Sequence, residues 1–137
     1  MRVIAGLVLS VLLIATVGAQ EGENPWRAVI DQQIEALREG DADTALELAG
    51  ATFKRVYSDG DSFLADIERA GYGPIISSRS HSFGQAREVG ETSVIVVVNL
   101  VGPNQGLYEA VYQMADEPDE GWRVQGVVLR PIEGIGI

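Results

Sequence analysis

The single histidine of this chain, His81, is the side chain best suited to acid–base chemistry near neutral pH. It is expected on a polar strand, where the alternation of an extended chain places Arg79 and Phe83 on the same face. One interpretation makes His81 a general base at the mouth of a pocket. The other makes it a surface histidine on an outer strand, and this second interpretation is favoured. His81 and Arg79 are nevertheless candidate ligand-binding residues.

Several classes of catalytic site need residues that the sequence lacks. With no cysteine and only one histidine, Cys–His nucleophilic pairs and multi-histidine zinc sites are excluded. A Gly-x-Ser-x-Gly elbow and the glycine-rich nucleotide motifs are also missing. Asp59-Gly60-Asp61 begins like a calcium loop, but Phe63 stands where the next oxygen ligand is needed. We expect no metal, no cofactor and no identifiable catalytic residue, and the sequence favours a protein that is not an enzyme.

Gln33 is an amide placed inside an apolar helical stripe. The stripe recurs at helical spacing and consists of Trp26, Val29, Ile30, Ile34 and Leu37. A buried amide must be hydrogen-bonded, or it costs roughly 1–3 kcal/mol. In a functional interpretation Gln33 faces a polar cavity between helix and sheet. In a structural interpretation, which is favoured, it bonds a strand backbone group and fixes the docking angle of the helix.

A predicted strand over 107–115 has an aromatic face and a mixed face. Alternation assigns the side chains to two sets: Leu107, Glu109, Val111, Gln113 and Ala115 on one face, and Tyr108, Ala110, Tyr112 and Met114 on the other. The aromatic face is expected to be core beneath the helices, with the lining of an apolar pocket as the alternative. Tyr112 and Gln113 join Gln33 as candidate ligand-binding residues.

Helices are expected in the first half of the chain and strands in the second. The first helix should begin at Pro25 after the capping residue Asn24 and end at Gly40. A second should begin at Asp41 or Asp43, and further helices are expected over 51–57 and 63–70. Strands are expected over 75–87, 92–101 (buried on both faces), 107–115 and 122–130. The pattern predicts an α+β fold, with N-terminal helices packed on a curved antiparallel sheet of about four strands.

The N-terminus predicts export. Residues 1–19 combine a cation at Arg2, a short apolar run and the small pair Gly18-Ala19, the layout of a cleavable secretory signal. Residues 20–137 would then form one domain in the periplasm or outside the cell, without a stable membrane anchor. The chain carries 20 acidic and 10 basic side chains, for a net charge of −10. Such a charge disfavours nucleic acid and anionic membranes as partners.

Two sequence segments carry a resemblance to a known family. The first runs from Val29-Ile30-x-x-Gln33-Ile34-x-Ala36-Leu37 to Gly71-Tyr72, and the second includes Tyr112-Gln113-Met114, an acidic turn and Gly121-Trp122-Arg123-Val124. In this order they resemble domain-of-unknown-function family 4864, a group of short exported bacterial proteins. The succession of helices and strands resembles an NTF2-like or cystatin-like cone. The family resemblance implies no activity and no site residues.

Three classes of function remain compatible with the sequence. The first is a non-catalytic module that binds a small apolar or amphipathic ligand between the first helix and the sheet, near Gln33, Tyr112 and Gln113. The second is a structural or protein-interaction domain, for example a homodimer formed through an exposed sheet face. The third, least favoured, is a small NTF2-like isomerase or hydrolase, which needs a desolvated acid or base deep in the fold.

Overall fold

Helices precede strands in the computed structural model, which describes residues 24–132. The helices are α1 (Pro25–Glu39), α2 (Ala42–Glu47), α3 (Ala51–Val56), α4 (Gly60–Arg69) and α5 (Gly73–Ile76). The strands are β1 (Ser80–Glu88), β2 (Ser93–Val101), β3 (Leu107–Glu117) and β4 (Gly121–Pro131), which form one antiparallel sheet in the order β1-β2-β3-β4. The predicted α+β class and four-stranded sheet are confirmed. The predicted signal, residues 1–19, lies outside the described residues.

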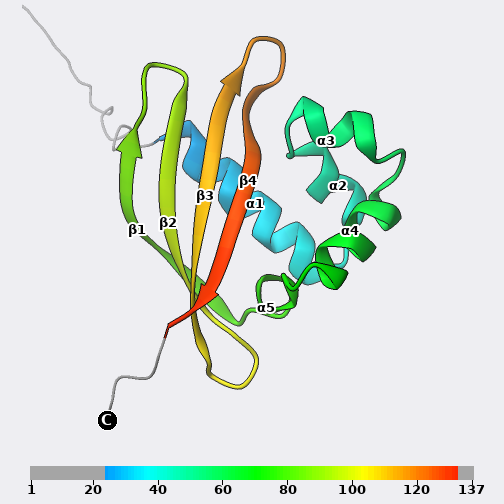
Figure 1. The fold of residues 1–137 in the computed structure, drawn as a ribbon, viewed down its shortest axis with the longest axis vertical. Helices are drawn as coiled ribbons and strands as arrows, with labels where there is room; N and C mark the ends of the chain where they lie inside the picture. The colour runs from blue at the N-terminus through cyan, green and yellow to red at the C-terminus, as the bar shows by residue number, and fades with distance from the viewer. Residues whose placement is uncertain (1–23, 133–137) are drawn as a thin grey trace, which may run out of the picture.

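Helix α1 lies across one face of the sheet (Figure 1). Pro25 occupies its first turn, where the missing N–H would have had no helical partner. Its apolar stripe is buried except for Val29, which is half-buried. Gly40 ends the helix at φ 76° and donates its N–H to the carbonyls of Ala36 and Leu37. The expected cap at Asn24 is wrong in one respect, because its side chain makes no capping bond.

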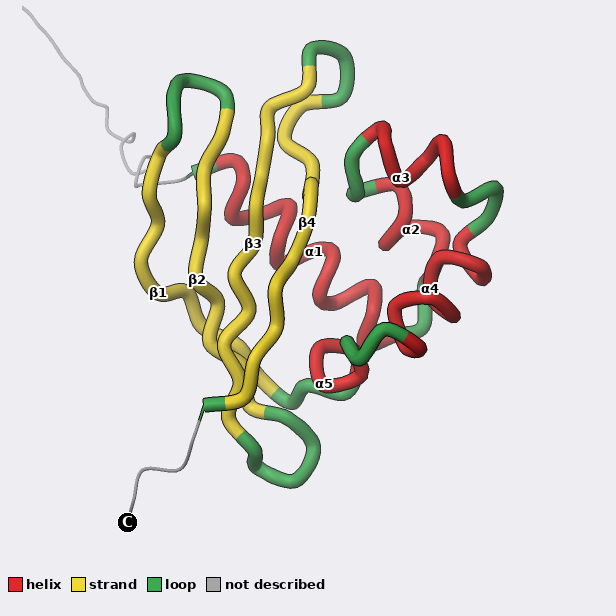
Figure 2. Tube along the Cα trace, in the orientation of Figure 1, coloured by secondary structure: helices red, strands yellow, loops and turns green. Residues whose placement is uncertain are grey.

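The first strand begins later than the sequence pattern predicts. Residues 73–76 form the short helix α5 instead, with Pro74 in its first turn and Ile75 buried in the core. Strand β2 also differs, because burial alternates along it and the even-numbered residues from Val94 to Leu100 are the buried ones. The prediction that this strand is buried on both faces is therefore wrong, since the helices cover only one face of the sheet (Figures 1 and 2).

The segment between α2 and α3 attaches the small helices to the free edge of β4. Val124 donates its backbone N–H to the carbonyl of Leu48 at 3.0 Å, and the N–H of Gly50 donates to the carbonyl of Val124 at 2.9 Å. Ala49 thereby forms a parallel bridge with Val124. These bonds place α2, α3 and α4 beside β4 (Figure 1).

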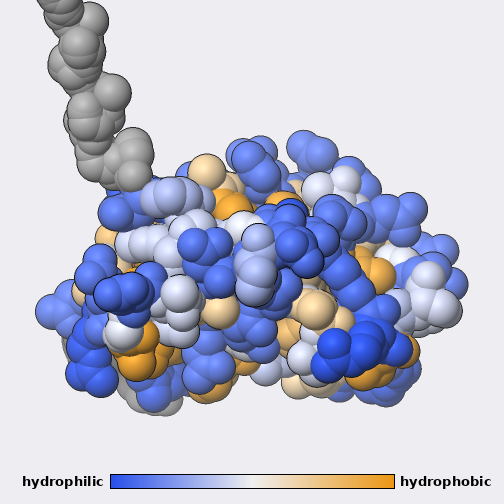
Figure 3. Space-filling view, turned by 90° about the horizontal axis from the view of Figure 1, so that it is seen from above, coloured by the Kyte–Doolittle hydropathy of each residue, from blue (hydrophilic) through white to orange (hydrophobic). Residues whose placement is uncertain are grey.

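The surface at the end of the sheet that carries the β3–β4 turn is mainly hydrophilic, with apolar residues in separate small patches (Figure 3). Within residues 24–132, no helix has both the length and the apolar character needed to cross a membrane.

Candidate functional site

Gln33 connects α1 to the end of α2. Its Nε2 donates to the backbone carbonyl of Ala45 at 2.9 Å, a buried bond. The usual helical donor to that carbonyl, the N–H of Ala49, bonds Leu46 instead. Gln33 therefore satisfies a backbone acceptor and fixes the position of α2, although the acceptor belongs to a helix and not to a strand as expected. Within the described part of the chain, its amide oxygen has no hydrogen-bond partner.

Tyr112 lies opposite α1 on the helix-facing side of β3. Alternation along the strand places it in the core, where it is 0% exposed. Its hydroxyl is buried and finds no hydrogen-bond partner among residues 24–132. Burial raises the pKa of the Tyr112 hydroxyl well above its ordinary value, and the positive charge of Arg38 opposes this only in part. The group is therefore a neutral phenol throughout the physiological pH range.

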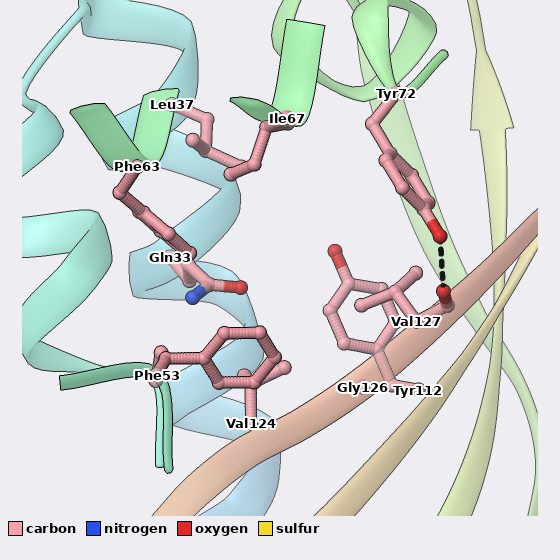
Figure 4. A pocket seen from close by; sticks show the side chains of 11 residues that line it. Gln33, Leu37, Phe53, Phe63, Ile67, Tyr72, Tyr112, Val124, Gly126 and Val127 are labelled. Carbon is pink, nitrogen blue, oxygen red and sulfur yellow. Dashed lines mark hydrogen bonds between the residues drawn. The ribbon is translucent and has the colours of Figure 1, made fainter. Parts of the chain in front are cut away.

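A chamber of about 130 Å³ separates these two polar groups. Its walls come from α1, the segment between α2 and α3, helices α3 and α4, the turn before α5, and strands β3 and β4 (Figure 4). The lining residues are Gln33, Leu37, Ala49, Phe53, Phe63, Ile67, Tyr72, Tyr112, Val124, Gly126 and Val127. The amide oxygen of Gln33 points toward the Tyr112 side of this space, and the Tyr112 hydroxyl points into it (Figure 4). The chamber is thus an apolar space with two polar atoms at its wall.

A bulge in β4 shapes the chamber floor. Tyr112 and Gln113 face Val127 and Gly126, but Met114 faces Val124, so that Gln125 is an extra residue. A bulge bends and twists its strand locally. The bend falls between Val124 and Gly126, both of which line the chamber.

Tyr72 closes one side of the chamber. Its hydroxyl donates to the carbonyl of Val127 at 2.7 Å, which ties the turn before α5 to β4 (Figure 4). Beyond this wall is a second hollow of about 420 Å³. Four residues line both spaces: Phe53, Phe63, Ile67 and Tyr72.

The charged groups of this outer hollow already have partners. Tyr57 donates its hydroxyl to Asp66 Oδ2 at 2.7 Å, and Asp66 also pairs with Arg69. Two polar atoms without a hydrogen-bond partner in the described residues, the Tyr112 hydroxyl and the Gln33 amide oxygen, therefore belong to the inner chamber and not to the outer hollow.

His81 lies away from the chamber and joins α1 to β1. Its Nε2 is 2.7 Å from Asp31 Oδ1, and its Nδ1 is 2.9 Å from Arg38 Nη2. Because a guanidinium only donates, Nδ1 must accept, so the ring proton lies on Nε2 and is donated to Asp31. Arg38 Nε also donates to Ser78 Oγ at 3.0 Å. Both ring nitrogens are engaged, and the arrangement fastens α1 to the start of the sheet without leaving a free base.

The candidate residues predicted from sequence separate into three places. Gln33 and Tyr112 meet at the chamber. Gln113 faces the opposite side of the sheet and is exposed, because neighbouring strand residues point to opposite faces; its grouping with the cavity is corrected. Arg79 is exposed just before β1 and lines neither the chamber nor the outer hollow. The sequence did not group Phe53, Ile67 and Tyr72 with Gln33 and Tyr112, because the packing of short helices has no signature in residue spacing.

The chamber lining suits binding better than acid–base catalysis. None of the described residues that line it is an acid, a histidine, a lysine or an arginine. Across residues 24–132, no group of three or more potential metal ligands comes together. A neutral phenol and an amide can orient a ligand through hydrogen bonds, but neither is a base of suitable strength for proton abstraction near neutrality.

Comparison with known proteins identifies the family of this chain. The family model described as Domain of unknown function (DUF4864) matches residues 19–136. No curated protein and no solved structure was found to match. The match covers most of the chain, so the chain belongs to this family.

Proposed function

Because membership of this family brings no assigned activity, we propose a function from the chamber itself. The protein is a non-catalytic binding module that holds a small apolar or amphipathic ligand between α1 and the sheet. The observation that carries this proposal is the Tyr112 hydroxyl, which is fully buried and has no hydrogen-bond partner in the described residues. A ligand with a polar group would supply that partner.

The unpaired, buried hydroxyl of Tyr112 destabilises the ligand-free protein. Such a group loses its hydrogen bonds to water and costs about 1–3 kcal/mol when nothing replaces them. Phenylalanine would fill the same space in the core without that cost. A tyrosine at this position is explained if a bound ligand forms a hydrogen bond with the hydroxyl and so offsets the free energy lost on its desolvation.

The size of the chamber limits what it can hold. At about 130 Å³ it is smaller than the 300 Å³ or more expected for a drug-sized ligand. It is close to the volume of about 150 Å³ at which an engineered protein cavity binds benzene. The ligand, or the part of it that enters the chamber, is therefore of the size of one six-membered ring.

An NMR titration tests the proposal. Labelled protein comprising residues 20–137 would be titrated with toluene, 1-hexanol and phenol while backbone amide shifts are recorded. We expect saturable shifts near Leu37, Tyr112 and Val127. A matched variant, Ala49→Leu, places a larger side chain at a lining position and should abolish these shifts while leaving the rest of the spectrum native-like. Absence of binding by all three compounds, or shifts that persist unchanged in Ala49→Leu, would refute the proposal.

A second candidate function, self-association, is favoured by the uncovered face of the sheet. Ile95, Val97 and Val111 are only half-buried there, and Val128 is 57% exposed. Apolar side chains gathered on one exposed face are typical of interaction surfaces. Sedimentation equilibrium would show a dimer that Val128→Glu converts to a monomer if this function holds, and a monomer at all concentrations if it does not.

The proposal also includes export and a fold relationship. The signal-like pattern of residues 1–19 supports removal of a leader, and the family model begins at residue 19. Mass spectrometry of the protein from extracytoplasmic fractions should find a chain beginning at Gln20, whereas an intact Met1 terminus in the cytoplasm would contradict export.

Helices packed on one face of a four-stranded meander support a relationship to NTF2-like or cystatin-like cones. An experimental structure with a different strand order would contradict it.

A further inference from the structure

The two polar atoms at the chamber wall differ in what they can accept and donate. The amide oxygen of Gln33 is only an acceptor, and one of the two N–H groups of its Nε2 is donated to the carbonyl of Ala45. The Tyr112 hydroxyl can donate one hydrogen bond and can also accept. No hydrogen bond joins the two side chains within the described structure, and both oxygens are directed toward the space between them (Figure 4).

A hydroxyl group is the simplest complement to this pair. It can donate its proton to Gln33 Oε1 and accept the proton of Tyr112 with its oxygen. A carboxylate has no proton to donate, so it would leave Gln33 Oε1 without a hydrogen bond. It would also bring a carboxylate oxygen close to Gln33 Oε1, and both of these atoms are acceptors. An ammonium group could donate to Gln33, but it would bring a charge into an apolar space that holds no counter-ion.

We propose that the chamber is selective for small uncharged hydroxyl compounds with a single-ring apolar body, that is, simple phenols and alcohols of that size. The ring occupies the space between Leu37, Phe63 and Val127, and the hydroxyl lies between Gln33 and Tyr112. This inference rests on the proposed function and adds the chemical class of the ligand. A longer substituent would extend past Tyr72 into the outer hollow.

The test compares three ligands that share one ring and differ in a single group. Phenol, toluene and benzoate would be titrated at pH 7 into the protein comprising residues 20–137 and into Tyr112→Phe, with dissociation constants from NMR shifts. Toluene is more apolar than phenol, so a chamber without polar partners prefers toluene. In the protein with Tyr112, phenol should bind at least as tightly as toluene, because toluene leaves both polar atoms unpaired.

The Tyr112→Phe variant isolates the contribution of the hydroxyl. Loss of one hydrogen bond should shift the preference from phenol toward toluene by about three- to tenfold, while toluene affinity stays equal or rises. Benzoate should show no saturable binding to either protein. Ala49→Leu, measured in parallel, should bind none of the three.

The outcomes separate the two proposals. If toluene binds more tightly than phenol to the protein with Tyr112, or if benzoate binds as well as phenol, the chamber is a binding site but the hydroxyl selectivity is refuted. If the phenol preference is unchanged in Tyr112→Phe, the proposed position of the hydroxyl is refuted. If none of the three binds, the proposed function itself fails, and the selectivity fails with it.

Discussion

Tyr112 and Gln33 are the two polar residues of the chamber lining whose oxygens are directed toward its interior. Each is buried in an apolar setting, and each has an oxygen facing the chamber. They differ in their structural roles, because the Gln33 side chain also bonds the backbone of α2, whereas the Tyr112 hydroxyl has no hydrogen-bond partner among residues 24–132. Removing the polar group should therefore have opposite effects on stability at the two positions.

Tyr112→Phe should make the ligand-free protein more stable by about 1 kcal/mol, because it removes an unpaired buried hydroxyl and keeps the ring. Urea denaturation measures the change. Tyr108→Phe is the matched control, as Tyr108 lies on the same face of β3 but is partly exposed, and it should change stability by less than about 0.5 kcal/mol. A clear loss of stability in Tyr112→Phe would mean that the hydroxyl already has a partner.

Gln33→Leu should destabilise the protein by about 1–3 kcal/mol, although leucine suits the apolar stripe. The reason is that the carbonyl of Ala45 would lose its side-chain donor in a buried position. Thermal or urea unfolding monitored by circular dichroism would measure the loss. A neutral or stabilising result would show that the bond to α2 contributes nothing to stability.

The residue types could be read from the sequence, but their partners could not. The interruption of an apolar helical stripe identified Gln33, and strand alternation placed Tyr112 in the core. His81 was also identified by its chemistry, yet its role depends on Asp31 and Arg38, which are seven positions apart on α1. Which turn of α1 meets β1 is set by tertiary packing, and nothing in the local sequence specifies it.

At the scale of elements, a close approach of α2 and α4 positions one wall of the chamber. The N–H of Gly60 donates to Asp43 Oδ1 at 3.2 Å. A Cβ atom at Gly60 would lie 2.5 Å from the backbone carbon of Ala42, closer than any side chain tolerates. Only glycine lets α4 start there and direct Phe63 and Ile67 toward the chamber.

Gly60→Ala should therefore destabilise the protein by about 1–3 kcal/mol through overpacking against backbone. Gly73→Ala is the control, because nothing lies within 4 Å of its added Cβ and its backbone is not left-handed. It should be neutral or stabilising by up to about 1 kcal/mol. Differential scanning calorimetry of both variants checks this, and equal melting temperatures would contradict the packing argument.

Glu117 links β3 to the N-terminus of α3 and should make stability depend on pH. The pKa of the Glu117 carboxyl lies below its ordinary value of 4.5 despite partial burial. The main cause is a hydrogen bond from the Gln125 side chain, and the backbone N–H of Ala51 donates a further one. The positive charges of Lys54 and Arg123 act in the same direction. Because the pKa is lowered in the folded state, the stabilisation is present above the unfolded value and is lost as the pH falls through the folded value.

Glu117→Gln should consequently be less stable than the original protein at pH 7, by less than about 1 kcal/mol since the group is largely solvated. The difference should shrink as the pH is lowered toward about 3. Urea denaturation across this range measures it. A difference that is constant with pH would show that the ionised carboxylate is not the stabilising form.

The element boundaries show where periodicity succeeds and where it fails. Helix α1 and the β2–β3–β4 meander have long, regular patterns and were predicted nearly to the residue. Helix α5 was read as strand because Ile75 and Ile76 are β-formers, but Pro74 and burial of Ile75 against the core decide the local structure. The expectation that β2 is buried on both faces failed because a β-branched run does not reveal how many layers cover the sheet.

The molecule as a whole consists of a sheet covered by helices on one face, an open opposite face and an inner chamber between the helices and the sheet. The overall architecture follows from the order of periodic segments in the sequence. The chamber does not, because it arises where helices and strands from separate parts of the chain fail to fill the space between them completely. Its existence depends on side-chain packing at many positions, which no local pattern encodes.

A crystal structure of residues 20–137 grown in the presence of phenol would test whether a ligand hydroxyl binds between Gln33 and Tyr112. We expect ring-shaped density in the chamber, with the ligand hydroxyl about 2.7–3.0 Å from both Gln33 Oε1 and the Tyr112 hydroxyl. A chamber filled by protein side chains, or one without phenol and with the Tyr112 hydroxyl bonded to a protein group, would contradict it.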